Sequence, residues 1–209
     1  MDHLHRLHDL FRRFPGIGPR QAKRFVYFLL TAPESYKKEL VDEISKLESR
    51  VSLCPTCYRF YDRKGAQKEC LICGDSTRRK DTLMIVAKDV DLEAIEKSRV
   101  YDGYYFVLGG NIPLFDKTTE TKIRSKELLQ RVESGSQKGL KEIILALSLN
   151  AEGEHTRESV ETLLSPTAKK LGVEIYTLGR GLSTGTELEY SDSETIKNAL
   201  LSKKREGIL

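Results

Sequence analysis

Residues 54–73 read CPTCYRFYDRKGAQKECLIC, and this stretch holds all four cysteines of the 209-residue chain. They form two Cys-x-x-Cys pairs, Cys54 with Cys57 and Cys70 with Cys73. Each pair lets two thiolates approach one ion from a tight turn, and the two turns complete a tetrahedron. Four thiolates leave no open coordination position, so the spacing predicts one structural zinc ion per chain, in a four-cysteine zinc finger over residues 53–76. The alternatives are two disulfides or four free thiols.

The residues before this segment have the periodicity of helices. Apolar side chains recur at helical spacing over residues 4–14, 20–30 and 35–51. A proline- and glycine-rich stretch separates the first two of these patterns, and Pro33 follows the second. We therefore expect residues 1–52 to form a small helical unit.

The stretch between the first two predicted helices reads PGIGP. Its glycines, Gly16 and Gly18, permit backbone geometry that side chains would forbid. The helix that follows can present backbone N–H groups to a phosphate, and Arg20, Lys23 and Arg24 supply cations on its first turns. This looks like a helix-hairpin-helix motif, which grips the DNA backbone without reading its sequence. A plain glycine–proline turn between packed helices is the alternative.

After the four cysteines, short apolar runs alternate with helical patterns. Strands are predicted over residues 82–87, 104–108, 142–147 and 173–178, and helices over 89–98, 122–134 and 154–171. Pro166 interrupts the last helix, which can divide it into two pieces. The alternation predicts an α/β fold in which βαβ units surround a mostly parallel sheet, here over residues 77–177. Residues 178–209 then form a tail with a glycine-rich turn and a final helix.

The net charge of +4 is unevenly distributed along the chain. Residues 11–24 contain five basic groups and no acid, whereas residues 89–209 contain seventeen basic and twenty acidic groups. A basic front favours a polyanionic partner, although an ordinary mixed surface explains the charges equally well. Charged residues make up 32% of the chain and no apolar run approaches the thickness of a bilayer, which argues against a membrane protein. The first ten residues lack a signal-peptide core, so we expect a cytoplasmic protein.

The order of a helix-hairpin-helix, four cysteines and an α/β domain resembles the RecR family of bacterial recombination mediators along essentially the whole chain. The stretches that carry the resemblance are FPGIGP at 14–19 with Ala22 and Arg24, the four cysteines, VLGG at 107–110, IILA at 143–146, EGE at 152–154 with Thr156, LGRG at 178–181 and GTELEYSD at 185–192. Each stretch alone is a weak signal. Their order and spacing together are specific.

The resemblance implies that the sheet domain is a Toprim domain and that Glu189, Tyr190 and Asp192 belong to a Walker-B-like dimerisation tail. It implies a homo-oligomer, either a dimer or a ring tetramer. It further implies a non-catalytic mediator of DNA repair that binds DNA independently of sequence and acts with RecO and RecF to help load RecA at gaps. The DNA contacts of the family fall on Arg20 and Arg24. Glu152 and Glu154 are weaker candidates for a partner contact.

Toprim enzymes hold Mg²⁺ with clustered carboxylates, and this chain departs from that pattern. Ala87 and Lys88 stand where the family usually has a glutamate pair, and no Asp-x-Asp follows residues 142–147. Asp89, Glu152 and Glu154 remain as carboxylates that could hold a weakly bound Mg²⁺ ion without a catalytic role. The alternative function is a divergent Toprim nuclease or primase-like enzyme that uses Mg²⁺. A third hypothesis is a zinc-ribbon transcription or scaffold protein, which would bind DNA in a sequence-dependent way.

Overall fold

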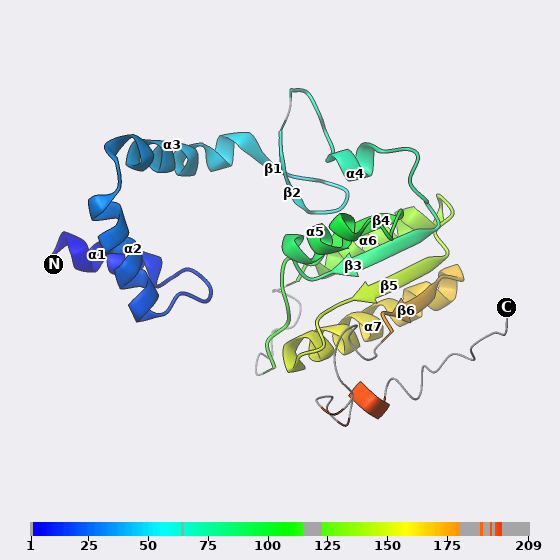
Figure 1. The fold of residues 1–209 in the computed structure, drawn as a ribbon. Helices are drawn as coiled ribbons and strands as arrows, with labels where there is room; N and C mark the ends of the chain where they lie inside the picture. Colours follow the sequence, from blue (N-terminus) through cyan, green and yellow to red (C-terminus); the bar gives the residue numbers. More distant parts are fainter. Residues whose placement is uncertain are drawn as a thin grey trace. The chain divides into compact units, whose positions relative to one another are not determined.

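The computed structural model describes residues 2–63, 65–114, 123–179, 189, 193 and 195–197. The chain is divided into two compact units, Met1–Ser52 and Leu53–Leu209 (Figure 1). Among the described residues, no helix combines the length and the apolar character that crossing a membrane requires. Most of the Walker-B-like segment and most of the predicted final helix lie outside the described residues.

The first unit consists of three helices, α1 (His3–Phe11), α2 (Pro19–Thr31) and α3 (Glu34–Arg50). Asp2 caps α1 by accepting a hydrogen bond from the amide of Leu4. Ala22 and Val26 of α2 are buried, and the rings of Phe11 and Phe25 meet edge to face with 5.5 Å between centroids. The predicted helices are confirmed. The first ends at Phe11 and not at residue 14, because the chain there turns toward the hairpin.

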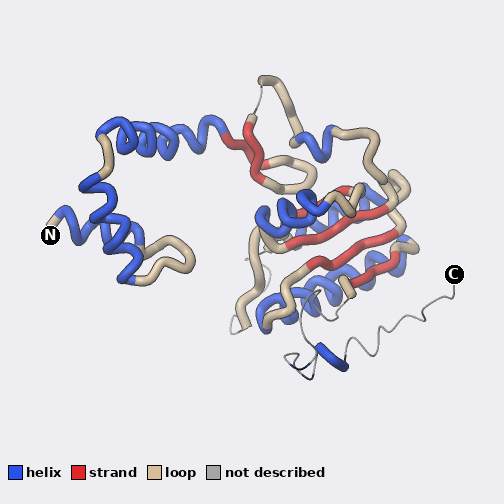
Figure 2. The backbone as a smooth tube through the Cα atoms, in the orientation of Figure 1, coloured by secondary structure: helices blue, strands red, loops and turns tan. Residues whose placement is uncertain are grey.

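The second unit is built on a four-stranded sheet in which every neighbouring pair of strands is parallel (Figure 2). Its strands in spatial order are β4 (Tyr104–Val107), β3 (Thr82–Val86), β5 (Glu142–Ala146) and β6 (Glu174–Thr177). All five residues of β3 are buried, as expected for a central strand that is covered on both faces. The predicted α/β class and parallel sheet are thus confirmed.

Alternate residues of the strands belong to two different apolar clusters, because successive side chains point to opposite faces. Leu83 and Ile85 of β3 pack with residues of α6 (Ser125–Ser136) and α7 (Ala151–Leu171). Met84 and Val86 pack with Leu92 of α5 (Asp89–Ser98) and also with Cys54, Cys57 and Cys70. The four-cysteine segment therefore shares an apolar core with one face of the sheet.

The helix α7 continues without interruption through Pro166, so the predicted division into two pieces is wrong. A proline inside a helix leaves the carbonyl four residues earlier without its amide partner, here that of Thr162. Thr162 and Pro166 are both exposed, so water can hydrogen-bond to this carbonyl. The cost of the proline is thereby reduced.

Candidate nucleic-acid interface and metal centre

The four cysteine sulfurs lie within 4.8 Å of one another, and the Sγ atoms of Cys57 and Cys70 are 3.5 Å apart. None of the four cysteines forms a disulfide bond. A zinc ion bonded to four sulfurs at about 2.3 Å requires neighbouring sulfurs about 3.8 Å apart. The donor set and its spacing therefore fit a tetrahedral metal ion.

Each cysteine pair is held by a tight local turn. In the first turn the amide of Tyr58 donates to the carbonyl of Cys54, and the amide of Cys54 donates to the carbonyl of Arg59, both at 2.9 Å. In the second, Cys70 is the N-cap of the short helix α4 (Leu71–Gly74), and the amide of Gly74 donates to its carbonyl at 3.0 Å. These hydrogen bonds place both cysteines of each pair on the same side of their turn.

Hydrogen bonds among the thiols shift their pKa values in opposite directions. Bonds with Cys57 and Cys70 lower the pKa of Cys54, whereas bonds with Cys54 raise the pKa of Cys57 and of Cys73. Four thiolates cannot coexist here without a cation, since buried anions at this separation disfavour one another. A bound divalent metal ion would offset the repulsion among the four thiolates, and its binding would release protons.

Several hydrogen bonds fasten the four-cysteine segment to the sheet domain. The amide of Val107 donates to the carbonyl of Cys57 at 2.8 Å, and the amide of Phe60 donates to Oδ1 of Asp89 at 2.8 Å. Arg124 donates from one guanidinium nitrogen to the carbonyls of Tyr58 and Val107, at 2.9 and 2.8 Å. The sequence gives no signal for Arg124, because its partners are backbone atoms far away in the chain.

The two glycines of the hairpin have different backbone roles. Gly16 has a φ of +76°, in the left-handed region that favours glycine. Gly18 is extended and forms the N-cap of α2, where no described side chain accepts a hydrogen bond from the free amides. Pro19 occupies the first turn, and in the part of the chain that the structure describes nothing lies within 4 Å of a Cβ added at either glycine. The helix start is therefore open to a ligand.

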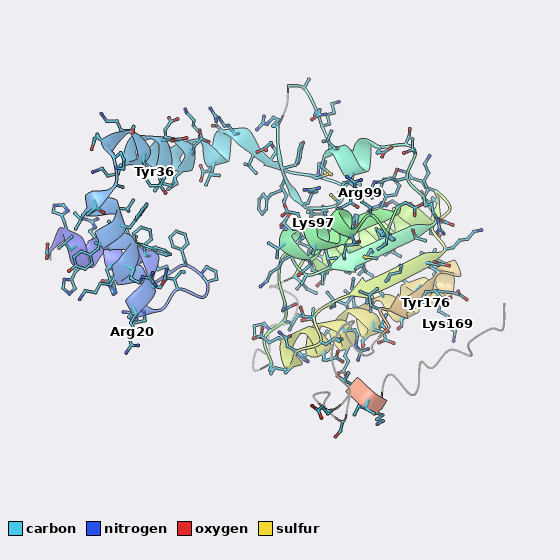
Figure 3. The ribbon with its side chains drawn as sticks, in the orientation of Figure 1. Arg20, Tyr36, Lys97, Arg99, Lys169 and Tyr176 are labelled. Carbon is cyan, nitrogen blue, oxygen red and sulfur yellow. The ribbon has the colours of Figure 1, made fainter. Side chains whose placement is uncertain are left out.

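The three predicted DNA contacts, Arg20, Lys23 and Arg24, are all exposed. They lie three and four residues apart, which places them on one face of α2. None forms an ion pair with a described residue, and the first turn of α2 contains no acid. Figure 3 shows Arg20 projecting away from the end of α2. Exposed cations beside a helix start that lacks a side-chain cap can bind a phosphate.

The carboxylates considered for Mg²⁺ are not brought together among the described residues, where the cysteines are the only group of three or more candidate ligands. Asp89 accepts the amide of Phe60, and Asp91 accepts the amide of Lys88 to cap α5. Glu154 forms an ion pair with Arg157 at 3.3 Å, while Glu152 is exposed. A partner contact through Glu152 and Glu154 stays a prediction.

Gly153, between these glutamates, permits a close approach of backbone segments. A Cβ added there would lie 2.0 Å from the carbonyl oxygen of Ser148. We expect Gly153→Ala to lower the free energy of unfolding by roughly 2–3 kcal/mol in urea denaturation, because backbone atoms must shift to make room. Gly179→Ala is the matched control, since no atom of a described residue lies within 4 Å of that Cβ. Equal stability of Gly153→Ala and the wild type would contradict this account.

The fold and the site together define a protein with a helix-hairpin-helix, a four-cysteine centre and a Toprim domain. Residues 4–47 match the family model described as "RecR, helix-hairpin-helix", and residues 81–178 match that of the Toprim domain. The chain is 36% identical to the recombination protein RecR of Pelotomaculum thermopropionicum, over 95% of this chain and 94% of that protein. It is 34% identical to RecR of Bifidobacterium longum subsp. infantis, over 96% of this chain and 95% of that protein. The chain belongs to the RecR family of recombination proteins.

Proposed function

We propose that this protein is a DNA-binding recombination mediator in DNA repair that grips the DNA backbone without reading its sequence. The observation that carries the proposal is the open start of α2, flanked by Arg20, Lys23 and Arg24 on one exposed face. Gly16 and Gly18 supply the backbone geometry of the hairpin. Phosphate contacts of this kind position a protein on DNA but carry no sequence information.

The metal in the four-cysteine centre is proposed to be a structural zinc ion, one per chain. Cys54, Cys57, Cys70 and Cys73 would be its ligands, which leaves no position open for a substrate. Bound zinc would fix the turns on which the hydrogen bonds to Val107 and Arg124 depend. It would thereby hold the four-cysteine segment against the sheet.

We further propose that the protein acts as a non-catalytic, clamp-like homo-oligomer in the cytoplasm, either a dimer or a ring tetramer. It would work with proteins of the RecO and RecF type to help load RecA at gapped DNA. Membership of the RecR family supports this role. The carboxylates of Asp89 and Asp91 each accept a hydrogen bond from a different backbone amide and do not meet at one site. This favours a scaffold over a Mg²⁺-dependent nuclease.

The test measures, by fluorescence anisotropy with Mg²⁺ present, how the protein binds labelled gapped duplexes of two unrelated sequences. If three cations per hairpin each contact a phosphate, affinity should fall roughly 40-fold between about 50 and 200 mM salt. The two sequences should bind equally, and their strands should stay intact on denaturing gels. Affinity that ignores salt, or strong sequence preference, would contradict the proposal. Strand cleavage that Glu152→Ala abolishes would favour the nuclease.

A further inference from the structure

A second basic site lies within the Leu53–Leu209 unit, in a cavity of about 550 Å³. Thr82 and Tyr104, which line it, are the first residues of β3 and β4. The cavity therefore lies at the amino-terminal ends of the strands. The carboxylates of a Toprim domain belong to the opposite, carboxyl-terminal ends. Residues of the four-cysteine segment and of α6 complete the wall.

Three cationic side chains line this cavity, Lys80, Arg131 and Lys138. None forms an ion pair with a described residue. The Nε atom of Arg131 is buried and has no hydrogen-bond partner among the residues that the structure describes, although its guanidinium lies 6.0 Å from the centroid of the Tyr104 ring. Glu69, the acidic residue of the lining, accepts a hydrogen bond from the hydroxyl of Thr56. A buried donor without a partner calls for a ligand, an ion or water.

The cations come from separate parts of the fold: Lys80 precedes β3, Arg131 lies on α6, and Lys138 follows α6. Donors that converge from several directions suit an anion with several acceptor oxygens, and a phosphate monoester offers three. The rest of the lining includes Leu83, the Tyr104 ring and Leu140. An apolar wall with a few convergent polar groups is typical of a small-molecule site.

We propose that this cavity binds the phosphate monoester of a nucleotide, with the phosphate between Lys80, Arg131 and Lys138 and the nucleoside against Tyr104. The cavity residues all belong to the Leu53–Leu209 unit, whereas the hairpin belongs to Met1–Ser52, and the proposal does not rest on the proposed DNA grip. A competing explanation is that the cations only offset the negative charge of a metal bound to four thiolates, since Cys73 also lines the cavity.

Calorimetric titration of the full-length, zinc-loaded protein with thymidine 5′-monophosphate, inorganic phosphate and thymidine tests the proposal. The monophosphate and phosphate should bind, and thymidine should not. Lys80→Ala/Lys138→Ala removes two exposed cations and should weaken binding about tenfold or more without unfolding the protein. Lys97→Ala is a matched control, an exposed lysine of α5 that does not line the cavity (Figure 3).

No binding of either phosphate compound to the wild type would overturn the proposal. So would equal binding by the double variant, or a double variant that loses zinc while its phosphate affinity is unchanged. A free nucleotide and a strand end are the two sources of such a group. Tighter binding of a 5′-phosphorylated than of a 5′-hydroxyl oligothymidylate, lost in the double variant, identifies the strand end. Equal binding of both strands, with the monophosphate still bound, identifies the free nucleotide.

Discussion

Cys57→Ser is expected to abolish metal binding and to lower the free energy of unfolding of the Leu53–Leu209 unit by several kcal/mol, because metal binding energy is folding energy in such a site. The effect should extend beyond the four-cysteine segment. Cys57 is buried in the same apolar cluster as Met84 and Val86 of the central strand, and its carbonyl accepts the amide of Val107. Loss of the turn therefore exposes one face of the sheet.

Zinc content by atomic emission and thermal unfolding by circular dichroism measure this result. Thr56→Ala is a matched control within the same turn, since it removes a hydroxyl that contacts Glu69 and keeps all four sulfurs. That variant should retain one zinc per chain. Chelation of the wild-type protein should reproduce the effect of Cys57→Ser, and added zinc should reverse it. A metal-free Cys57→Ser protein that melts at the wild-type temperature would refute the structural role.

The strands were predictable because burial imposes a periodic pattern on them. The predicted helix over residues 89–98 coincides with α5, and each predicted strand differs from β3, β4, β5 or β6 by one or two residues at its ends. Apolar runs such as 82–87 report burial on both faces of a sheet, which is a local property of the chain. The metal site of the four cysteines could be predicted for the same reason, since ligand spacing is also a local property of the chain.

Contacts between distant segments leave no such pattern. The docking of the four-cysteine segment onto the sheet depends on Arg124, whose acceptors are the carbonyls of Tyr58 and Val107. Backbone acceptors have no sequence signature, so the contact was not predicted. The prediction that Pro166 divides its helix is wrong for a related reason, because the cost of a helical proline depends on whether the free carbonyl reaches water.

The two basic sites also differ in whether their residues are neighbours in the sequence or come together only in the fold. Arg20, Lys23 and Arg24 are neighbours in sequence, and helical spacing alone places them on one face. Lys80, Arg131 and Lys138 line one cavity only because β3 and α6 meet in the folded unit. The first site could be proposed from the sequence and the second could not.

Charge reversal at the hairpin, Arg20→Glu/Arg24→Glu, is expected to weaken binding to gapped DNA roughly hundredfold or more at about 100 mM salt. Two phosphate contacts are lost, and two carboxylates then repel the backbone. The slope of log affinity against log salt should also become shallower by about two. Fluorescence anisotropy over a salt series gives both quantities. The loss should be the same for unrelated DNA sequences, since contacts to phosphates ignore the bases.

The fold should survive this reversal, which makes the result interpretable. Arg20 has no ion pair with a described residue, and the one side-chain hydrogen bond of Arg24 to a described residue is a long one of 3.4 Å to Gln21. A glutamate at position 20 places an acid in the first turn of α2, where the helix dipole favours it. Lys169→Glu/Lys170→Glu, an exposed pair on α7, changes the net charge equally and should retain affinity. If both double variants lose the same affinity, net charge and not the hairpin governs binding; if the hairpin variant binds like the wild type, α2 does not hold the DNA.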